Sequence, residues 1–277
     1  MQSSNAVPGD GVRFFVWGGA GRTFSMVCLS LSIVVITFNE EANLARTLSS
    51  VTWADEILVL DSGSTDRTRE IAESFRAKFL VEPWKGFAAQ KNSALAKAAG
   101  DWILSLDADE EVEPALASEI RQALAANPTV AGFWIPRKNF FLGRWMKHGG
   151  FYPDRKLRLF RRGAGQFQDR LVHEDIRLEG ASTQLQHHLL HHAYPTLSDY
   201  LEHMNRYSSL GAEMACSTGS RGFSFVDIAI RPKLTFFYNY LLRLGFLDGR
   251  EGLLLHAYHA GYVSWKYAKA WEMSQNR

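Results

Sequence analysis

The sequence of 277 residues has little cysteine and no long apolar run. Cys28 and Cys216 are isolated and lack C-x-x-C spacing, which argues against a structural disulfide and favours a reducing compartment. The charge-free stretches 23–39 and 252–265 are too short and too polar for the ~20 apolar residues of a membrane-spanning helix. A signal peptide is also not expected, because Arg22 interrupts the apolar patch 14–20. We therefore expect a cytoplasmic protein.

The sequence also lacks a large net charge, since the formal value is +2, but its charged residues are unevenly distributed along the chain. Residues 1–131 carry 11 Lys and Arg against 17 Asp and Glu, whereas residues 132–170 carry 10 against 2. With 46% hydrophobic and 22% charged residues, the composition excludes a disordered or collagen-like chain. Segment 1–27 is glycine-rich and lacks periodicity. We expect it to be either a disordered extension or the product of a start codon assigned too early, with Met26 close to the first strand.

In the first half of the chain, segments with the hydrophobic period of a strand alternate with segments with that of a helix. Strand patterns occupy 29–36, 56–61, 78–83 and 101–109, and helical patterns follow them at 40–51, 65–77, 86–99 and 114–126. This alternation predicts an α/β fold with a mostly parallel sheet flanked by helices. Short mixed strands are expected over 130–192, and helices over 197–215, 232–244 and 251–271. The predicted divisions are a domain at 28–193, with halves at 28–127 and 128–193, and a helical extension at 194–277.

Polar residues gather where the predicted parallel strands end, which is where sheets of this kind bind ligands. Asp107 and Asp109 would repel each other there unless a divalent cation lay between them and a diphosphate. The alternative is that the strand runs into an acidic first turn of the following helix, formed by Glu110, Glu111 and Glu113. Asp61 ends an earlier strand, before a turn at Gly63 that we expect to form without its carboxylate. That carboxylate is therefore available for an N–H of a nucleobase.

Four segments in order, ITFNEEANLARTLSSV, LVLDSGSTD, AAQKNSALAKAAGDWILSLDAD and LVHED, resemble the family 2 glycosyltransferases of GT-A fold. More narrowly, they resemble the bacterial lipopolysaccharide core enzymes that add β-linked glucose to an inner-core heptose. The resemblance runs from about Leu29 to the C-terminus. It implies an inverting transferase that uses a UDP-sugar and a divalent metal, Mg²⁺ or Mn²⁺.

The resemblance also implies roles for individual residues. The base and ribose pocket would be lined by Thr37, Phe38 and Glu40, and the uracil would contact Asp61. The phosphates would lie near Lys91. The metal would be held by Asp107 and Asp109. Glu174 or Asp175 would be the base that takes the proton from the acceptor hydroxyl, with His173 orienting it or touching the acceptor. Arg158 and Arg161 are candidates for binding a phosphate of the acceptor or the diphosphate. An exposed acidic loop remains the alternative for residues 173–175.

Three further patterns have more than one interpretation. The histidines of a predicted strand, His187, His188, His191 and His192, either complete a metal site or are structural. Basic residues between 137 and 170 alternate with aromatics, a pattern that suggests nucleic-acid binding. No nucleic-acid-binding motif accompanies it, and binding of an anionic glycolipid explains the charges equally well. The aromatic and basic C-terminal helices either cap the sheet or lie on a membrane surface. We expect a lipopolysaccharide core acceptor, no nucleic acid, and peripheral contact with the cytoplasmic face of the inner membrane.

Other functions of this fold remain open as alternatives. The acceptor could be another glycan or a polyprenyl phosphate, although no C-terminal transmembrane pair is evident for the latter. A nucleotidyltransferase would need a glycine-rich, basic loop after the first strand, where the chain has the acidic pair Glu40 and Glu41. A catalytically inactive sugar-binding or assembly protein is the non-enzymatic alternative.

Overall fold

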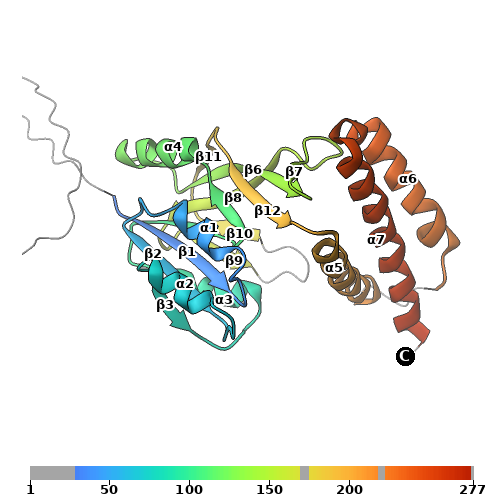
Figure 1. The fold of residues 1–277 in the computed structure, drawn as a ribbon, viewed down its shortest axis with the longest axis horizontal. Coiled ribbons are helices and arrows are strands. Elements are labelled where there is room, and N and C mark those ends of the chain that lie inside the picture. Colours follow the sequence, from blue (N-terminus) through green and yellow to red (C-terminus); the bar gives the residue numbers. More distant parts are fainter. Residues whose placement is uncertain (1–28, 169–174, 218–221, 276–277) are drawn as a thin grey trace, which may run out of the picture.

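The computed structural model describes residues 29–168, 175–217 and 222–275 (Figure 1). The interpretation of segment 1–27 therefore lies outside the described residues. Ten strands form one mixed sheet in the order β3-β2-β1-β4-β8-β6-β12-β5, with β7 and β11 both paired to β6. None of the described helices is long and apolar enough to cross a bilayer.

The first half of the sheet is parallel, as the alternating pattern predicts. Its strands are β1 (Leu31–Thr37), β2 (Glu56–Asp61), β3 (Lys78–Val81) and β4 (Trp102–Leu106). The helices that follow them are α1 (Leu44–Ser49), α2 (Thr68–Ser74), α3 (Phe87–Leu95) and α4 (Pro114–Ala125). Most of these elements are shorter than their sequence patterns, because the polar residues at the strand ends belong to turns. The α/β fold class is confirmed.

The second half of the sheet is mixed. Its strands are β5 (Glu110–Val112), β6 (Gly132–Phe141), β7 (Arg144–Trp145), β8 (Asp154–Arg161), β11 (Ser182–Gln184) and β12 (Leu189–Tyr194). A separate antiparallel pair is formed by β9 (Gly165–Gln168) and β10 (Asp175–Leu178). β5 pairs antiparallel with β12, so Glu110 and Glu111 are strand residues. Their alternative interpretation as the acidic start of a helix is wrong, because α4 begins only at Pro114.

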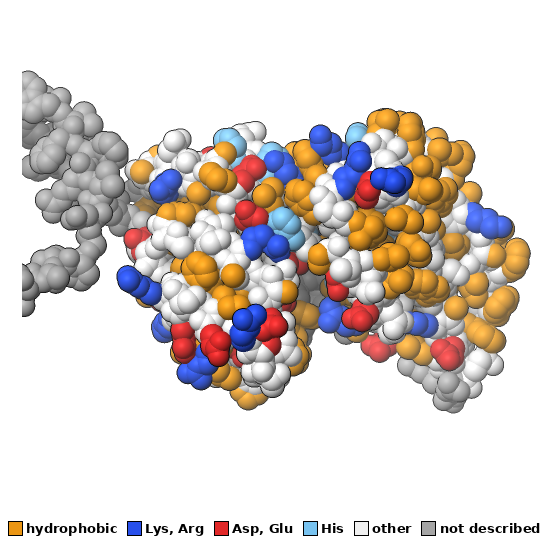
Figure 2. All heavy atoms as spheres, in the orientation of Figure 1, with side chains coloured by type: hydrophobic (Ala, Val, Ile, Leu, Met, Phe, Trp, Pro, Cys, Tyr) orange, Lys and Arg blue, Asp and Glu red, His pale blue; other side chains and the backbone are white. Residues whose placement is uncertain are grey.

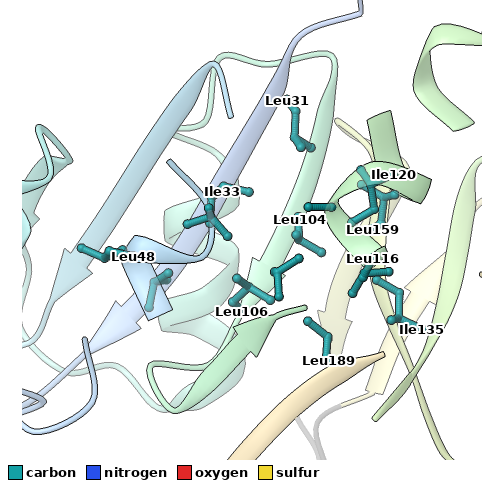
Figure 3. Close-up of a cluster of buried hydrophobic side chains, with 14 of the residues drawn as sticks. Leu31, Ile33, Leu48, Leu104, Leu106, Leu116, Ile120, Ile135, Leu159 and Leu189 are labelled. Carbon is teal, nitrogen blue, oxygen red and sulfur yellow. The ribbon is translucent and has the colours of Figure 1, made fainter. Parts of the chain in front are cut away.

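Apolar side chains cover both faces of the sheet. One cluster joins β1 and β4 to α1, α2 and α4, and Figure 3 shows Leu104 and Leu106 pointing toward Leu116 of α4 and Leu189 of β12. The other cluster lies beneath α3 and the β9–β10 pair. Fully burying a side chain of this size stabilises the fold by about 1.5–3 kcal/mol. The first four strands are therefore a rigid support for the loops at their carboxyl ends.

The C-terminal part is helical and lies beside the sheet, where β12 ends (Figure 1). Its elements are α5 (Leu197–Ser217), the π-helical turns η1 (Val226–Ile230) and η2 (Tyr238–Leu242), α6 (Arg231–Phe237), the 3-10 turn η3 (Gly245–Asp248) and α7 (Gly249–Gln275). α7 packs against both α5 and α6. The single helix expected over 232–244 is instead composed of α6 and η2, which differ in helical type.

Candidate active site

The carboxyl ends of β1, β2 and β4 meet at one edge of the sheet. In the parallel register Thr37 lies beside Asp61, and the Thr37 hydroxyl donates a 2.8 Å hydrogen bond to Asp61 Oδ1. Burial raises the pKa of Glu40, and the negative charges of Asp109 and Asp107 raise it further. The structure therefore brings together carboxylates from the loops after β1 and β4, as the parallel sheet predicts.

Asp61 holds the turn that follows it. Its Oδ2 accepts from the backbone N–H groups of Gly63 and Ser64, at 2.8 and 2.7 Å, and its Oδ1 accepts from the Ser64 hydroxyl as well as from Thr37. The residue is 2% exposed. The expectation that this turn forms without the Asp61 carboxylate is wrong, since the carboxylate is the acceptor for its amides.

Phe38 and Glu40 follow β1 and differ in their surroundings. Phe38 is 58% exposed, although its neighbour Thr37 is buried. Glu40 accepts a hydrogen bond from the side-chain amide of Asn43, and its backbone N–H donates to the hydroxyl of Thr68. An apolar ring therefore projects at the same edge that carries the carboxylates.

Asp107 is neutralised by two buried cations. Lys91 of α3 lies with its Nζ 2.8 Å from Oδ1, and Arg158 of β8 donates to Oδ2. Burial opposes ionisation of Asp107, but the charges of Arg158 and Lys91 hold its pKa well below the usual range. Lys91 on its alanine-rich helix is thus not a solvated surface lysine, but reaches Asp107 at the end of β4.

The charged network continues away from the strand end. Arg158 also donates to Glu110, which is fully buried, and Glu110 accepts a second hydrogen bond from Arg137 at 2.9 Å. Arg137 in turn pairs with Asp154 at 2.7 Å. Sequence reasoning missed Glu110, Arg137 and Asp154. Glu110 belongs to the acidic segment 1–131, and Arg137 and Asp154 belong to the basic segment 132–170, but no short-range pattern predicts which of them meet.

Asp109 faces His191 of β12, with Oδ2 3.3 Å from Nε2. The other ring nitrogen of His191 lies 2.7 Å from Oδ1 of Asn139, whose amide nitrogen donates to the Phe151 carbonyl and to Asp154. Because Asn139 Oδ1 can only accept, Nδ1 of His191 carries a hydrogen, and Nε2 is the ring atom that faces the Asp109 carboxylate. Within the described ranges no third Asp, Glu, His or Cys joins them in a cluster of metal ligands.

The three other histidines of the cluster have acidic partners outside the strand-end site. His187 pairs with Glu119, His188 with Glu113 and His192 with Glu111, at 2.9, 3.0 and 2.9 Å. Only His191 and His192 lie in β12, because the strand begins at Leu189. The prediction that all four histidines lie in one strand is therefore wrong for His187 and His188.

Several expected site residues lie elsewhere or outside the described residues. Arg161 donates to the carbonyls of Pro128 and Val130 and stacks on Trp102, the first residue of β4. It is therefore at the opposite end of that strand from Asp107. Asp175 begins β10 beside Gln168, whereas His173 and Glu174 lie outside the described residues.

Aromatic side chains of α5 stand near Asp109. The ring of His203 stacks on Tyr207, with centroids 4.1 Å apart, and meets Tyr194 edge-on at 5.3 Å. Burial lowers the pKa of His203 to about 4, together with the charges of Arg206 and His191. The negative charge of Asp109 acts on His203 and also on Tyr194. Sequence reasoning did not single out this group, which becomes visible only when α5 folds beside β12.

The fold is that of known GT-A sugar transferases. A mannosyltransferase of Pyrobaculum calidifontis, solved in complex with GDP-Man and Mn²⁺, superposes with a TM-score of 0.52 at 15% identity, over 87% of each chain. At that identity the similarity concerns the fold alone. It identifies the fold to which the sheet edge described above belongs.

The sequence comparisons establish the family. Residues 32–178 match the profile of glycosyl transferase family 2, and the chain belongs to this family. It is 33% identical to the lipopolysaccharide core biosynthesis glycosyltransferase LpsC of Rhizobium meliloti, over 80% of this chain and 82% of that protein. It is 29% identical to an uncharacterized glycosyltransferase of Rickettsia typhi, over 81% and 80%. The protein is therefore a family 2 glycosyltransferase, as the motifs indicate.

Proposed function

We propose that this glycosyltransferase transfers glucose, with inversion, from UDP-glucose to a heptose of a lipopolysaccharide core acceptor. The observation that carries the proposal is the meeting of Asp107, Asp109 and Lys91 at the carboxyl edge of the parallel strands. Similarity to LpsC supports the acceptor class. Both substrates would be met on the cytoplasmic face of the inner membrane.

The divalent metal of the proposal, Mg²⁺ or Mn²⁺, would be held by Asp109 and His191. A carboxylate oxygen and an imidazole nitrogen that face each other suit such an ion, and Asn139 orients the imidazole from behind. Two protein ligands are enough when a substrate diphosphate supplies the rest. The metal would neutralise the charge of the departing nucleoside diphosphate. The mannosyltransferase of similar fold was solved with Mn²⁺, which supports a metal here.

The donor nucleotide would lie along the ends of β1 and β2. The exposed ring of Phe38 offers a face for the uracil, while Thr37, Glu40 and Asp61 shape the pocket beneath it. Asp107 would face the ribose and the metal. Lys91, which is paired with Asp107, would exchange that carboxylate for a phosphate oxygen.

The acceptor would enter from the β12 and α5 side. Glu174 or Asp175 is proposed as the base that removes the proton of the acceptor hydroxyl while its oxygen attacks the anomeric carbon opposite the diphosphate. His173 would orient that carboxylate. His203 and Tyr207 offer an aromatic face for an acceptor sugar. Arg158 acts on Asp107 and Glu110 in this proposal, and Arg161 has no part in binding.

The test is a transfer assay with the full chain, UDP-glucose, Mn²⁺ and a heptosylated core acceptor. The expected product is the acceptor with one added hexose in β-linkage, measured by mass spectrometry and NMR. Asp109→Asn and Glu174→Gln are expected to lose this product while still folding. Transfer only from another sugar nucleotide, or only to another lipid, would refute the donor or the acceptor but leave the family activity intact.

A further inference from the structure

The helical extension exposes an unusual amount of apolar surface. Twelve of the 19 large hydrophobic side chains that are exposed in the described residues lie between 223 and 247. Phe225, Leu234 and Leu242 are 65, 62 and 63% exposed. Figure 2 shows hydrophobic side chains gathered over this part of the molecule. We define the surface by its most prominent members, Phe223, Phe225, Leu234, Phe237, Leu242 and Leu247.

The area of this surface exceeds what a monomer normally leaves in water. A half-exposed side chain of this size presents about 100 Å², so the whole surface amounts to roughly 1,000 Å². The largest apolar patch of a typical monomeric protein is about 300–600 Å². Side chains of the neighbouring α7 already occupy one side of these helices, since Ser264 donates to the Ile228 carbonyl and Arg231 stacks on Tyr267. The opposite side is the one that needs a partner.

Within the segment that carries the apolar surface, the exposed charges are positive. Between residues 222 and 250 the only acids are Asp227 and Asp248. Asp227 pairs with Arg231 at 2.8 Å, and Asp248 is 2% exposed and bonded to His148. Lys233, Arg243 and Arg250 are exposed. Apolar side chains surrounded by cations match a bilayer surface that contains anionic headgroups.

A second copy of the chain fits this surface less well. Closed dimers use the same patch on both subunits, so Lys233 and Arg250 would face a patch of the second copy that carries the same cations. No exposed acid of the segment 222–250 is left to pair with them. Like charges would therefore be buried together, whereas anionic lipid would neutralise them.

The surface is attached firmly to the sheet. The N–H of Gly149 donates to the carbonyl of Arg243 at 2.9 Å, and His148 holds the Asp248 carboxylate through its backbone N–H and its ring. These residues follow β6 and β7, in the half of the sheet that carries Asn139. We propose that residues 223–247 insert their apolar side chains into the interface of an anionic bilayer, and that this contact fixes the orientation of the active-site edge.

Vesicle sedimentation of the full chain tests the proposal. The wild type is expected to sediment with vesicles of phosphatidylglycerol and phosphatidylethanolamine, and to do so at least about tenfold less with phosphatidylcholine alone. The triple variant Leu234→Gln/Phe237→Gln/Leu242→Gln should lose binding by at least about tenfold. Val81→Gln/Trp84→Gln/Phe87→Gln, which changes exposed apolar residues near α3, is the matched control and should bind as the wild type does.

A charge variant keeps the test valid if the triple variant unfolds. Lys233→Glu/Arg250→Glu should weaken vesicle binding at least about tenfold and leave the melting temperature unchanged. UDP binding should be unaffected in every variant, so failure of the proposed function and failure of the membrane proposal are distinguishable. Equal sedimentation of wild type and both variants would overturn the proposal. The proposal would also be overturned if analytical ultracentrifugation showed that the wild type is a dimer and the triple variant a monomer.

Discussion

The sheet edge and the helical extension depart in opposite ways from the usual distribution of charged and apolar side chains. At the edge, Glu110 and Arg158 are charged and withdrawn from water, and both form ion pairs. In the extension, Phe225 and Leu234 are apolar and exposed to it. Each arrangement costs free energy in the isolated chain, and each is explained by a partner of matching chemistry. The comparison separates the edge proposed to bind a charged nucleotide from the surface proposed to contact lipid.

The largest expected effect is the loss of a buried cation. Arg158→Met removes the guanidinium shared by Asp107 and Glu110 and should lower the free energy of unfolding by about 3–5 kcal/mol. Arg155→Met, on the same strand but exposed, should change it by less than about 0.5 kcal/mol. Denaturant unfolding measures both. Equal effects would mean that the buried network does not stabilise the sheet edge.

The next effect concerns the metal. His191→Ala should weaken Mn²⁺ binding in the presence of UDP by about 10–100-fold, and Asn139→Ala by about tenfold, because Asn139 only orients the ring. His187→Ala is the control, since its partner is Glu119 and not Asp109. Titration calorimetry gives the three constants. A loss in His187→Ala as large as in His191→Ala would contradict the assignment.

Acid stability offers a third measurement. Burial opposes ionisation of Asp154, but the charges of Arg137 and Lys156 lower its pKa to about 2. A depressed folded pKa contributes stability above the unfolded value near 4, and this stability is lost as pH falls toward 2. Asp154→Asn should therefore be less stable than wild type by about 2 kcal/mol at pH 6 and nearly equal to it at pH 2. A pH-independent difference would exclude this ion pair as the cause.

The smallest effect belongs to the apolar surface. Leu234→Gln should change the free energy of unfolding by less than about 0.5 kcal/mol, because the side chain is already 62% exposed. Leu104→Ala, in the core of β4, should cost about 2–5 kcal/mol. Thermal and denaturant unfolding compare them directly. A large loss in Leu234→Gln would show that this side chain packs within the chain.

The hydrophobic periodicity of the sequence predicted the parallel half of the sheet and the edge that carries Asp107 and Glu40. Those residues follow strands whose register is set by local pattern, so their meeting is a consequence of topology. The position of Lys91 came from resemblance alone. The α-helical expectation for 232–244 missed the π-helical turns, which depend on packing against α7.

Contacts between distant segments account for the rest. His191 became distinct from His187 only because β12 pairs with both β5 and β6 and directs one ring at Asp109. The role of Asp61 in its own turn was misjudged because the backbone N–H groups of that turn need an acceptor that periodicity does not reveal. Counting charges identified the acidic segment 1–131 and the basic segment 132–170, but it did not predict that Arg137 and Arg158 form ion pairs between them.

The central claim is that the carboxylates of the sheet edge bind a metal-nucleotide complex. UDP titrated into the full chain, with Mn²⁺ and with EDTA, tests it directly. Mn²⁺ should tighten UDP binding at least about tenfold in the wild type and leave it nearly unchanged in Asp109→Asn. Equal UDP affinity of the wild type with Mn²⁺ and with EDTA would contradict the claim, as would full metal dependence in Asp109→Asn.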